Sequence, residues 1–232
     1  MAKLPLLSPD YNIFLDGGIE KGTITGIYGP AGSGKTLSCM LAALSPELKD
    51  KKIIYIDTES GFYVDRFKQL SPDYQQDLKR IIFFFPKSFE ELRNISLNVE
   101  RLVNDKVGLI IIDSISSFYR LEIAKKSDQK SLNAEFVAMT RIFSEIAKKY
   151  GTPIIFTSQV YADMSSRDKV IPIGSFILKN RCRFLIELEK LDNNQRRAKI
   201  VKDINDKELI ESPKKEIVMD FLIVNEGILK KQ

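Results

Sequence analysis

The chain has no histidine, no tryptophan and only two cysteines among its 232 residues. Without histidine, it cannot use histidine acid–base catalysis, a Ser/His triad or histidine-ligated zinc. Cys39 and Cys182 are far apart and form no C-x-x-C pair, which argues against a metal site or a disulfide framework. We therefore expect a protein of a reducing cytosol, with Cys39 in the core.

Long apolar runs are also missing. No stretch approaches the roughly 18 apolar residues of a membrane span, and residues 1–5 begin no apolar signal region. Neither secretion nor membrane insertion is predicted, so we expect a cytoplasmic location. With 44% hydrophobic residues the chain can bury a large core, and we expect one domain over residues 1–232.

No strong charge excess is present. The 36 basic and 31 acidic residues give a formal net charge of +5. This excess is compatible with a nucleic-acid partner but too small to require one, and a balanced, charge-rich surface is the alternative.

One motif with a defined chemistry stands near the start of the chain. Residues 29–36 fit the P-loop pattern G-x-x-x-x-G-K-[ST], between a strand-like segment at 23–28 and a helix-like segment at 35–44. In such a loop, backbone N–H groups and the helix start bind phosphates. Lys35 would bridge the β- and γ-phosphates and Thr36 would bind Mg²⁺, whereas the alternative is a plain glycine-rich turn. The motif residues are Gly29, Pro30, Ala31, Gly32, Ser33, Gly34, Lys35 and Thr36.

Strand and helix patterns alternate along the first 160 residues. Further strands are expected at 52–57, 81–85, 108–113 and 153–159, and long helices at 88–102 and 132–150. This order predicts an α/β fold with a mostly parallel central sheet and helices on both faces. From Asn180 onward, short strands at 184–188, 197–201 and 217–224 predict a C-terminal antiparallel extension of the same sheet.

Three polar residues lie at or just after the ends of the predicted parallel strands. Asp113, Glu59 and Gln159 should lie near the P-loop, because ligands bind at the carboxyl ends of such strands. Asp113 is the expected Mg²⁺ carboxylate, acting through water, or else a capping aspartate. Glu59 could activate the attacking water or be a solvated loop residue, and Gln159 could bind the γ-phosphate without carrying charge.

These pieces resemble the RecA/RadA recombinase family, and within it a short archaeal paralogue. The resemblance runs over nearly the whole chain. It rests on Asp16–Gly22, the P-loop, Tyr55–Glu59, Phe62–Arg66, Leu109–Ser114, Phe118–Arg120, Thr157–Val160 and Ile171–Gly174. It implies a RecA-type ATPase core that uses ATP and Mg²⁺.

By this resemblance, several residues acquire roles. Glu59 would be the catalytic carboxylate, and Gln159 the sensor that couples the γ-phosphate to the loop after it. Arg66 would pack its guanidinium on the adenine, as planar arginine can, although a surface arginine is the alternative. Leu37 completes the implied nucleotide-contacting set.

The family binds DNA through two loops near its filament axis. Here they would lie within residues 120–130 and 161–175. Their basic residues are Arg120, Lys125, Lys126, Lys130, Arg167 and Lys169. Contacts of this kind neutralise phosphates, so binding to single-stranded or branched DNA should be salt-sensitive and independent of sequence. Ordinary solvated loop charge is the alternative.

The chain also departs from the recombinases. It begins almost at the expected ATPase core, without their N-terminal helical domain and polymerisation motif, and Gly174–Ser175 replaces their Gly-Gly pair. Residues 202–208 lack their proline-containing segment, which covers the neighbouring subunit's ATP. These differences predict weak hydrolysis and argue against active filaments, although self-association stays open.

Three functions remain as hypotheses. The first is a DNA-binding ATPase that assists recombination and repair, with ATP as a switch. The second is a mediator that docks on a recombinase, resolvase or polymerase. The third, a KaiC-like signalling ATPase, is disfavoured because Ser60 follows Glu59, where adjacent acidic residues are usual.

Overall fold

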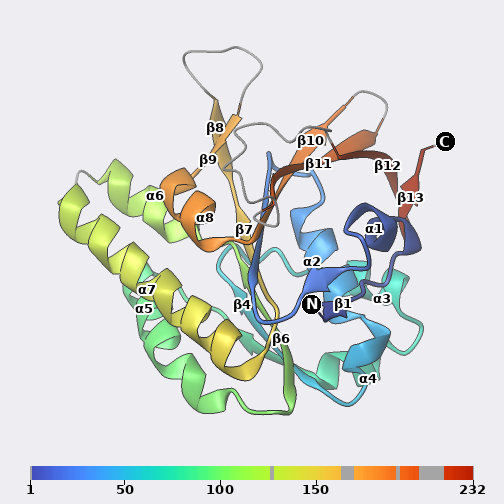
Figure 1. Cartoon of the computed structure of the whole chain (residues 1–232), viewed down its shortest axis with the longest axis horizontal. Coiled ribbons are helices and arrows are strands. Elements are labelled where there is room, and N and C mark those ends of the chain that lie inside the picture. The colour runs from blue at the N-terminus through green and yellow to red at the C-terminus, as the bar shows by residue number, and fades with distance from the viewer. Residues whose placement is uncertain (1, 126–127, 163–169, 192–193, 204–216, 232) are drawn as a thin grey trace.

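The computed structural model describes residues 2–125, 128–162, 170–191, 194–203 and 217–231. Its centre is a nine-stranded sheet in the order β13-β12-β11-β10-β3-β7-β6-β4-β5 (Figure 1). The strands are β3 (Ile24–Tyr28), β4 (Lys52–Asp57), β5 (Ile81–Phe84), β6 (Val107–Asp113), β7 (Ile154–Ser158), β10 (Phe184–Lys190), β11 (Gln195–Asp203), β12 (Val218–Val224) and β13 (Gly227–Lys230). The pairs from β5 to β10 are parallel, and those from β10 to β13 are antiparallel. The predicted fold class is confirmed.

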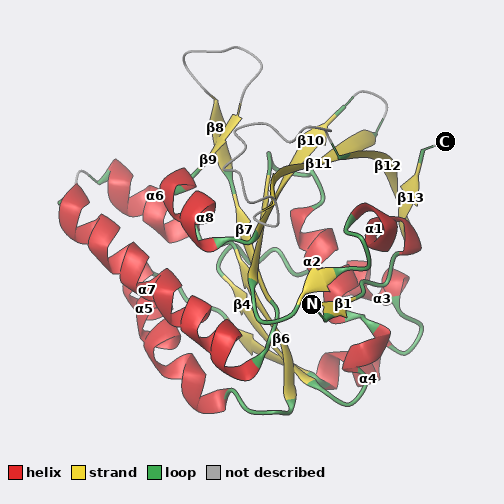
Figure 2. Ribbon diagram, in the orientation of Figure 1, coloured by secondary structure: helices red, strands yellow, loops and turns green. Residues whose placement is uncertain are grey.

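Helices cover both faces of this sheet (Figure 2). One face carries α1 (Pro9–Phe14), α2 (Lys35–Ala43), α3 (Val64–Leu70) and α4 (Tyr74–Lys79). The other carries α5 (Phe89–Asn98), α6 (Ser117–Ala124), α7 (Gln129–Tyr150) and α8 (Ser175–Arg181). Two separate apolar clusters correspond to these two layers. Among the described residues, no helix combines the length and the apolar composition of a membrane span.

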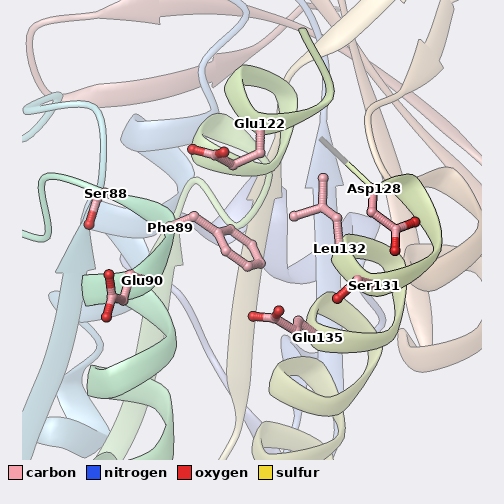
Figure 3. A pocket seen from close by; sticks show the side chains of 8 residues that line it. All are labelled: Ser88, Phe89, Glu90, Glu122, Asp128, Ser131, Leu132 and Glu135. Carbon is pink, nitrogen blue, oxygen red and sulfur yellow. The ribbon is translucent and has the colours of Figure 1, made fainter. Parts of the chain in front are cut away.

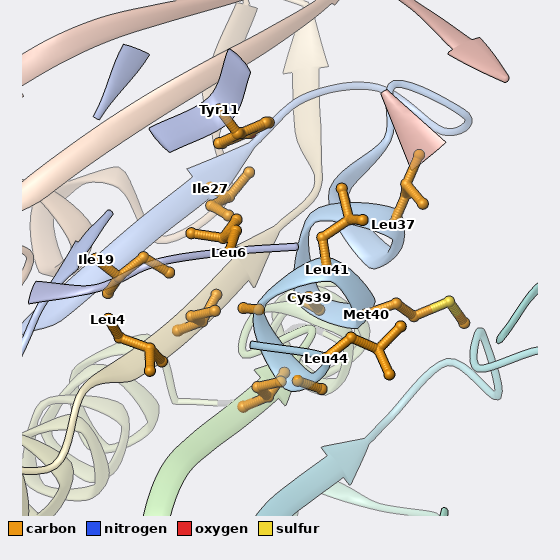
Figure 4. Packing of buried hydrophobic residues seen from close by; sticks show 14 of the residues in the cluster. Leu4, Leu6, Tyr11, Ile19, Ile27, Leu37, Cys39, Met40, Leu41 and Leu44 are labelled. Atoms are coloured by element: carbon orange, nitrogen blue, oxygen red, sulfur yellow. The ribbon is translucent and has the colours of Figure 1, made fainter. Parts of the chain in front are cut away.

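Helix α2 lies between the sheet and the N-terminal segment (Figure 4). Eight of its nine residues are buried, including Cys39. On its outer side, the Tyr11 hydroxyl hydrogen-bonds Ser38 Oγ at 3.1 Å, and burial raises the pKa of Tyr11 to about 12. The helix that starts at the P-loop is thus fixed on both sides.

The long helix of the opposite layer forms as its spacing predicts. The apolar side chains of α7, from Leu132 to Ile146, face the core, and the helix ends at Gly151 with φ 65°. Glycine adopts this left-handed conformation without a steric penalty. At the start of α5, Ser88 Oγ accepts a hydrogen bond from the Glu91 amide at 3.1 Å, as expected of an N-cap.

Several boundaries differ from the prediction. Strand β10, expected to be antiparallel, runs parallel to β3, because helix α8 provides the crossover that a parallel connection requires. Residue 180 is still helical for the same reason. The helix expected to reach Leu102 ends at Asn98 and continues as a 3-10 turn, η2 (Val99–Leu102). Two small strand pairs were not predicted, β1 (Lys3–Leu4) with β2 (Ile19–Glu20) and β8 (Val160–Ala162) with β9 (Val170–Pro172).

Candidate nucleotide-binding site

The P-loop motif lies between β3 and α2, as the sequence predicts. The backbone of Gly32 and Gly34 is left-handed, with φ of 73° and 108°. The Lys35 ammonium is buried and donates to the carbonyl oxygens of Gly29 at 2.8 Å and Pro30 at 3.0 Å. Burial lowers the pKa of Lys35, while the negative charges of Asp113 and Glu59 oppose this shift. The loop therefore holds a cation close to its own backbone.

Asp113 lies at the end of β6, between β7 and β4, and is buried. Its Oδ2 accepts hydrogen bonds from Thr36 Oγ1 at 2.7 Å and from the Tyr55 hydroxyl at 3.0 Å. Its Oδ1 accepts a hydrogen bond from Thr157 Oγ1. Burial raises the pKa of Asp113, although these three hydroxyl groups act in the opposite direction. The structure therefore brings the two expected Mg²⁺ ligands, Thr36 and Asp113, into direct contact.

The donor set suits a hard cation that keeps most of its water. Within the described part of the chain, no three His, Cys, Asp or Glu residues gather as a metal cage. One carboxylate and one hydroxyl oxygen fit Mg²⁺, which is usually bound through one or two carboxylates together with water and phosphate oxygens. Asp113 and Thr36 would hold the ion.

Asp57 shapes the loop that carries Glu59. Its carboxylate accepts hydrogen bonds from the backbone amides of Glu59 at 3.1 Å, Gly61 at 3.1 Å and Phe62 at 3.0 Å. The Glu59 carboxylate itself accepts a hydrogen bond from Ser114 Oγ, next to Asp113. Glu59 thus lies beside Asp113, as predicted. Sequence reasoning identified Asp57 only as a strand end; the polar Thr-Glu-Ser-Gly run after it is the signal for this turn.

A set of hydroxyl groups joins the ends of the central strands. Thr58 Oγ1 donates to the Ser114 carbonyl at 2.8 Å and accepts from the Ser114 amide at 2.9 Å. Ser116 Oγ accepts from the Gln159 amide at 3.2 Å. The Gln159 carbonyl accepts from the Ile173 amide at 2.9 Å, just after the hairpin β8–β9. The backbone of the expected sensor therefore connects the site to that hairpin.

These features agree with known proteins. A family model described as Rad51 matches residues 4–230. The chain belongs to the Rad51 family. It is 38% identical to the DNA repair and recombination protein RadB of Methanococcoides burtonii over 189 residues, covering 81% of this chain and 83% of that protein. It is 33% identical to the RadB of Thermoplasma volcanium over 227 residues, covering 97% and 92%.

A solved structure extends the agreement to three dimensions. The crystal structure of the RadB recombinase superposes with a TM-score of 0.76 and 28% sequence identity, covering 96% of this chain and 98% of that one. The family resemblance inferred from the motifs is therefore confirmed.

Arg66 lies on α3, and its guanidinium has protein partners. It donates to the carbonyls of Val224 at 2.6 Å and Asn225 at 3.0 Å, in the turn between β12 and β13. Burial lowers the pKa of Arg66, and the negative charge of Glu226 acts in the opposite direction. Arg66 thus anchors the C-terminal hairpin, and its stacking on adenine stays a prediction.

The first expected DNA loop of this Rad51-family chain is largely helical, which corrects the prediction. Arg120 is exposed on α6, Lys125 caps the end of that helix, and Lys130 lies in the first turn of α7. Helix forms here because Phe118 and Tyr119 are buried on one side, and because Asp128 caps α7 by accepting the Lys130 amide at 3.0 Å. Lys126, Arg167 and Lys169 lie outside the described residues.

The same segment borders an acidic groove of about 390 Å³ between α5, α6 and α7 (Figure 3). Glu90, Glu122, Asp128 and Glu135 are among its lining residues. Lys125 forms an ion pair with Glu122 at 2.8 Å, so part of its charge is already compensated. Because carboxylates repel phosphate, this groove is unsuited to a nucleotide or a DNA backbone.

Proposed function

We propose that this protein binds ATP with Mg²⁺ at the P-loop, hydrolyses it slowly and uses it as a switch for DNA binding in recombination and repair. One observation carries the proposal. Lys35 and Thr36 begin helix α2, Glu59 lies just after β4 and Asp113 ends β6, and the four side chains lie around one point beside the carboxyl ends of these strands. The names of the RadB relatives, which are DNA repair and recombination proteins, support the biological setting.

Each residue has a distinct task in this proposal. The loop 29–34 binds phosphate oxygens through backbone amides, and Lys35 carries charge to the β- and γ-phosphates. Thr36 and Asp113 hold Mg²⁺, which neutralises charge that develops on the phosphates. Glu59, held by Ser114, orients and deprotonates the attacking water. Leu37 and Arg66 remain the proposed contacts to the rest of the nucleotide.

The switch would act through Gln159. Its amide and carbonyl are bound to Ser116 and Ile173, so a shift of Gln159 toward a γ-phosphate would move the hairpin β8–β9 with it. Arg120 and Lys130 are exposed cations of the described part that DNA can reach, and Lys125 contributes less because of Glu122. Binding would therefore be weak, salt-sensitive and independent of sequence.

The ion pair between Lys125 and Glu122 also supports a second candidate. A segment of mixed charge beside an acidic groove suits a protein surface better than a DNA backbone. In that case the protein would act as an ATP-dependent mediator on a recombinase, resolvase or polymerase. The 232 residues would still act as one RecA-like domain in the cytoplasm, and self-association is open in both cases.

The test compares Lys35→Ala and Glu59→Gln with the wild type. Lys35→Ala should weaken ATP binding by about 100-fold, because a charge-assisted contact to phosphate is lost in a buried site. Glu59→Gln should keep ATP affinity within about threefold and lower the ATPase rate by roughly 100-fold. Fluorescent-nucleotide titration and phosphate release measure the two effects, and thermal melting checks that both variants fold.

DNA affinity separates the two candidates. Single-stranded and branched DNA are titrated at low salt, with and without ATP. An ATP-dependent change in affinity supports the switch. If ATP binds normally and DNA does not bind at any salt concentration, the mediator is favoured. If Lys35→Ala bound ATP as tightly as the wild type, the assignment of residues 29–36 as a P-loop would be contradicted.

A further inference from the structure

The hairpin formed by β10 and β11 lies against the P-loop. A Cβ added at Gly29 would come within 2.2 Å of the Leu188 carbonyl oxygen, so the two backbones approach closely there. At Gly32, the contact is a hydrogen bond from Arg196 Nε to the Gly32 carbonyl at 2.9 Å. The C-terminal strands therefore support the bend of the phosphate-binding loop directly.

Arg196 brings a buried positive charge to this bend. The residue is 9% exposed, and its guanidinium also donates to another backbone carbonyl, that of Gln195, at 2.8 Å. Carbonyl oxygens satisfy its donors without neutralising its charge. Over the described ranges of the chain, no carboxylate forms an ion pair with Arg196.

A second cation stands directly opposite. Lys190 pairs with Arg196 in the register of β10 and β11, so both side chains lie on the face of the hairpin that meets the P-loop. The Lys190 ammonium would be 3.8 Å from a Cβ placed at Gly32. Like charges directly opposite each other on neighbouring strands destabilise a sheet.

On the other face of β11, the positive charge is compensated by a carboxylate. Arg197, the next residue, pairs with Asp220 of β12, with Nε to Oδ1 at 2.7 Å and Nη2 to Oδ2 at 2.8 Å. Adjacent arginines thus differ in one respect: one faces a carboxylate, and the other faces the phosphate-binding loop. An anion at that loop would compensate Arg196 and Lys190 as Asp220 compensates Arg197.

We propose that Lys190 and Arg196 form a cationic clamp for the polyphosphate of the bound nucleotide, with Arg196 positioning the Gly32 bend and both charges stabilising the phosphates. The inference rests on the proposed ATP binding. It assigns to the C-terminal strands of the same chain part of the charge that a P-loop site requires.

The experiment measures Mg·ATP affinity by fluorescent-nucleotide titration at several salt concentrations in the full chain. Arg196→Ala should weaken binding about tenfold, since a buried charge and its directional bond to the loop are both lost. Lys190→Ala, at an exposed position, should weaken it roughly threefold. Arg196→Lys keeps the charge and should lie between wild type and Arg196→Ala. Arg197→Ala is the matched control and should bind as the wild type does.

Salt dependence separates charge from simple support of the fold. Removing a cation that faces the phosphates should flatten the dependence of affinity on salt, and Arg196→Lys should restore it. Affinities of Lys190→Ala and Arg196→Ala equal to that of Arg197→Ala would overturn the clamp. An Arg196→Lys variant as weak as Arg196→Ala, with an unchanged salt slope, would also overturn it. Lys35→Ala is measured alongside: if it binds ATP as well as the wild type, the P-loop proposal itself has failed, and the clamp with it.

Discussion

The central parallel strands and the C-terminal antiparallel strands carry their polar side chains in different places. Along β6, Leu109 to Ile112 are fully buried and the functional group comes last, at Asp113. Along β11, buried and half-buried residues alternate from Arg196 to Val201, so that Arg196 faces the P-loop while Arg197 faces Asp220. A strand covered on both faces places its charged groups at its end, whereas a strand with one open face can carry charged groups along its length.

The largest expected effect is the loss of stability when a buried side chain of the central strands is shortened. Ile111→Ala removes a fully buried side chain from β6 and should lower the free energy of unfolding by about 2–5 kcal/mol. Ile228→Ala, at a half-buried position on edge strand β13, is the control and should cost clearly less. Denaturant unfolding measures both. Equal losses would mean that the two regions of the sheet are packed alike.

A change at the end of β6 should affect nucleotide binding and leave the stability of the fold intact, whereas a change in the middle of β6 affects stability. Asp113→Asn should weaken Mg²⁺-dependent ATP binding by about 10- to 100-fold, because it removes the charged ligand. Burial raises the pKa of Asp113, and a carboxyl whose pKa is raised by folding lowers the stability of the fold when it is ionised. The unliganded variant should therefore melt no lower than the wild type. Asp220→Asn, away from the site, should keep its nucleotide affinity; a melting temperature for Asp113→Asn as low as that of Ile111→Ala would contradict the comparison.

The smallest effect concerns the ion pair on the open face of β11. Arg197 donates a hydrogen bond to Asp220, and this bond together with the positive charge of Arg197 holds the pKa of the Asp220 carboxyl below its usual range. A depressed carboxyl pKa stabilises the fold above the unfolded pKa, and this contribution disappears as pH falls through the folded pKa. Both side chains are at least a third exposed, so the pair is worth only about 0.5 kcal/mol. The wild type should exceed Asp220→Asn by this amount at about pH 7, and the difference should disappear as the pH falls through the lowered pKa of Asp220. A difference that persists below that pKa would exclude the ion pair as its source.

Much of the central region could be predicted from the sequence because its signals are local. The P-loop spacing, the apolar runs and the polar residues that end them all lie within short stretches, and the ends of parallel strands must meet at one edge. These local patterns are sufficient to predict that Lys35, Thr36, Asp113 and Glu59 lie near one another. The apolar face of helix α7 could also be predicted, from the spacing of its hydrophobic residues.

The remaining parts depend on contacts between distant segments. Tyr55 looks like a core residue in its strand, and only the neighbouring strand shows that its hydroxyl binds Asp113. Arg196 and Arg197 are neighbouring arginines that the sequence alone does not distinguish. Only the register of β11 shows that Arg196 contacts the P-loop and Arg197 contacts Asp220. A DNA-binding loop was expected within residues 120–130 from the family resemblance, but helix α6 extends to Ala124 because Phe118 and Tyr119 are buried against the core.

The Asp57 carboxylate binds three amides of the loop that carries Glu59. A loop held in this way has already lost most of its conformational freedom during folding, so little more is lost when a nucleotide arrives. Asp57 takes no part in the chemistry proposed for Glu59. If Glu59 acts as proposed, Asp57 would determine how often Glu59 faces the nucleotide, and so it would set the frequency of productive encounters rather than the barrier of each one.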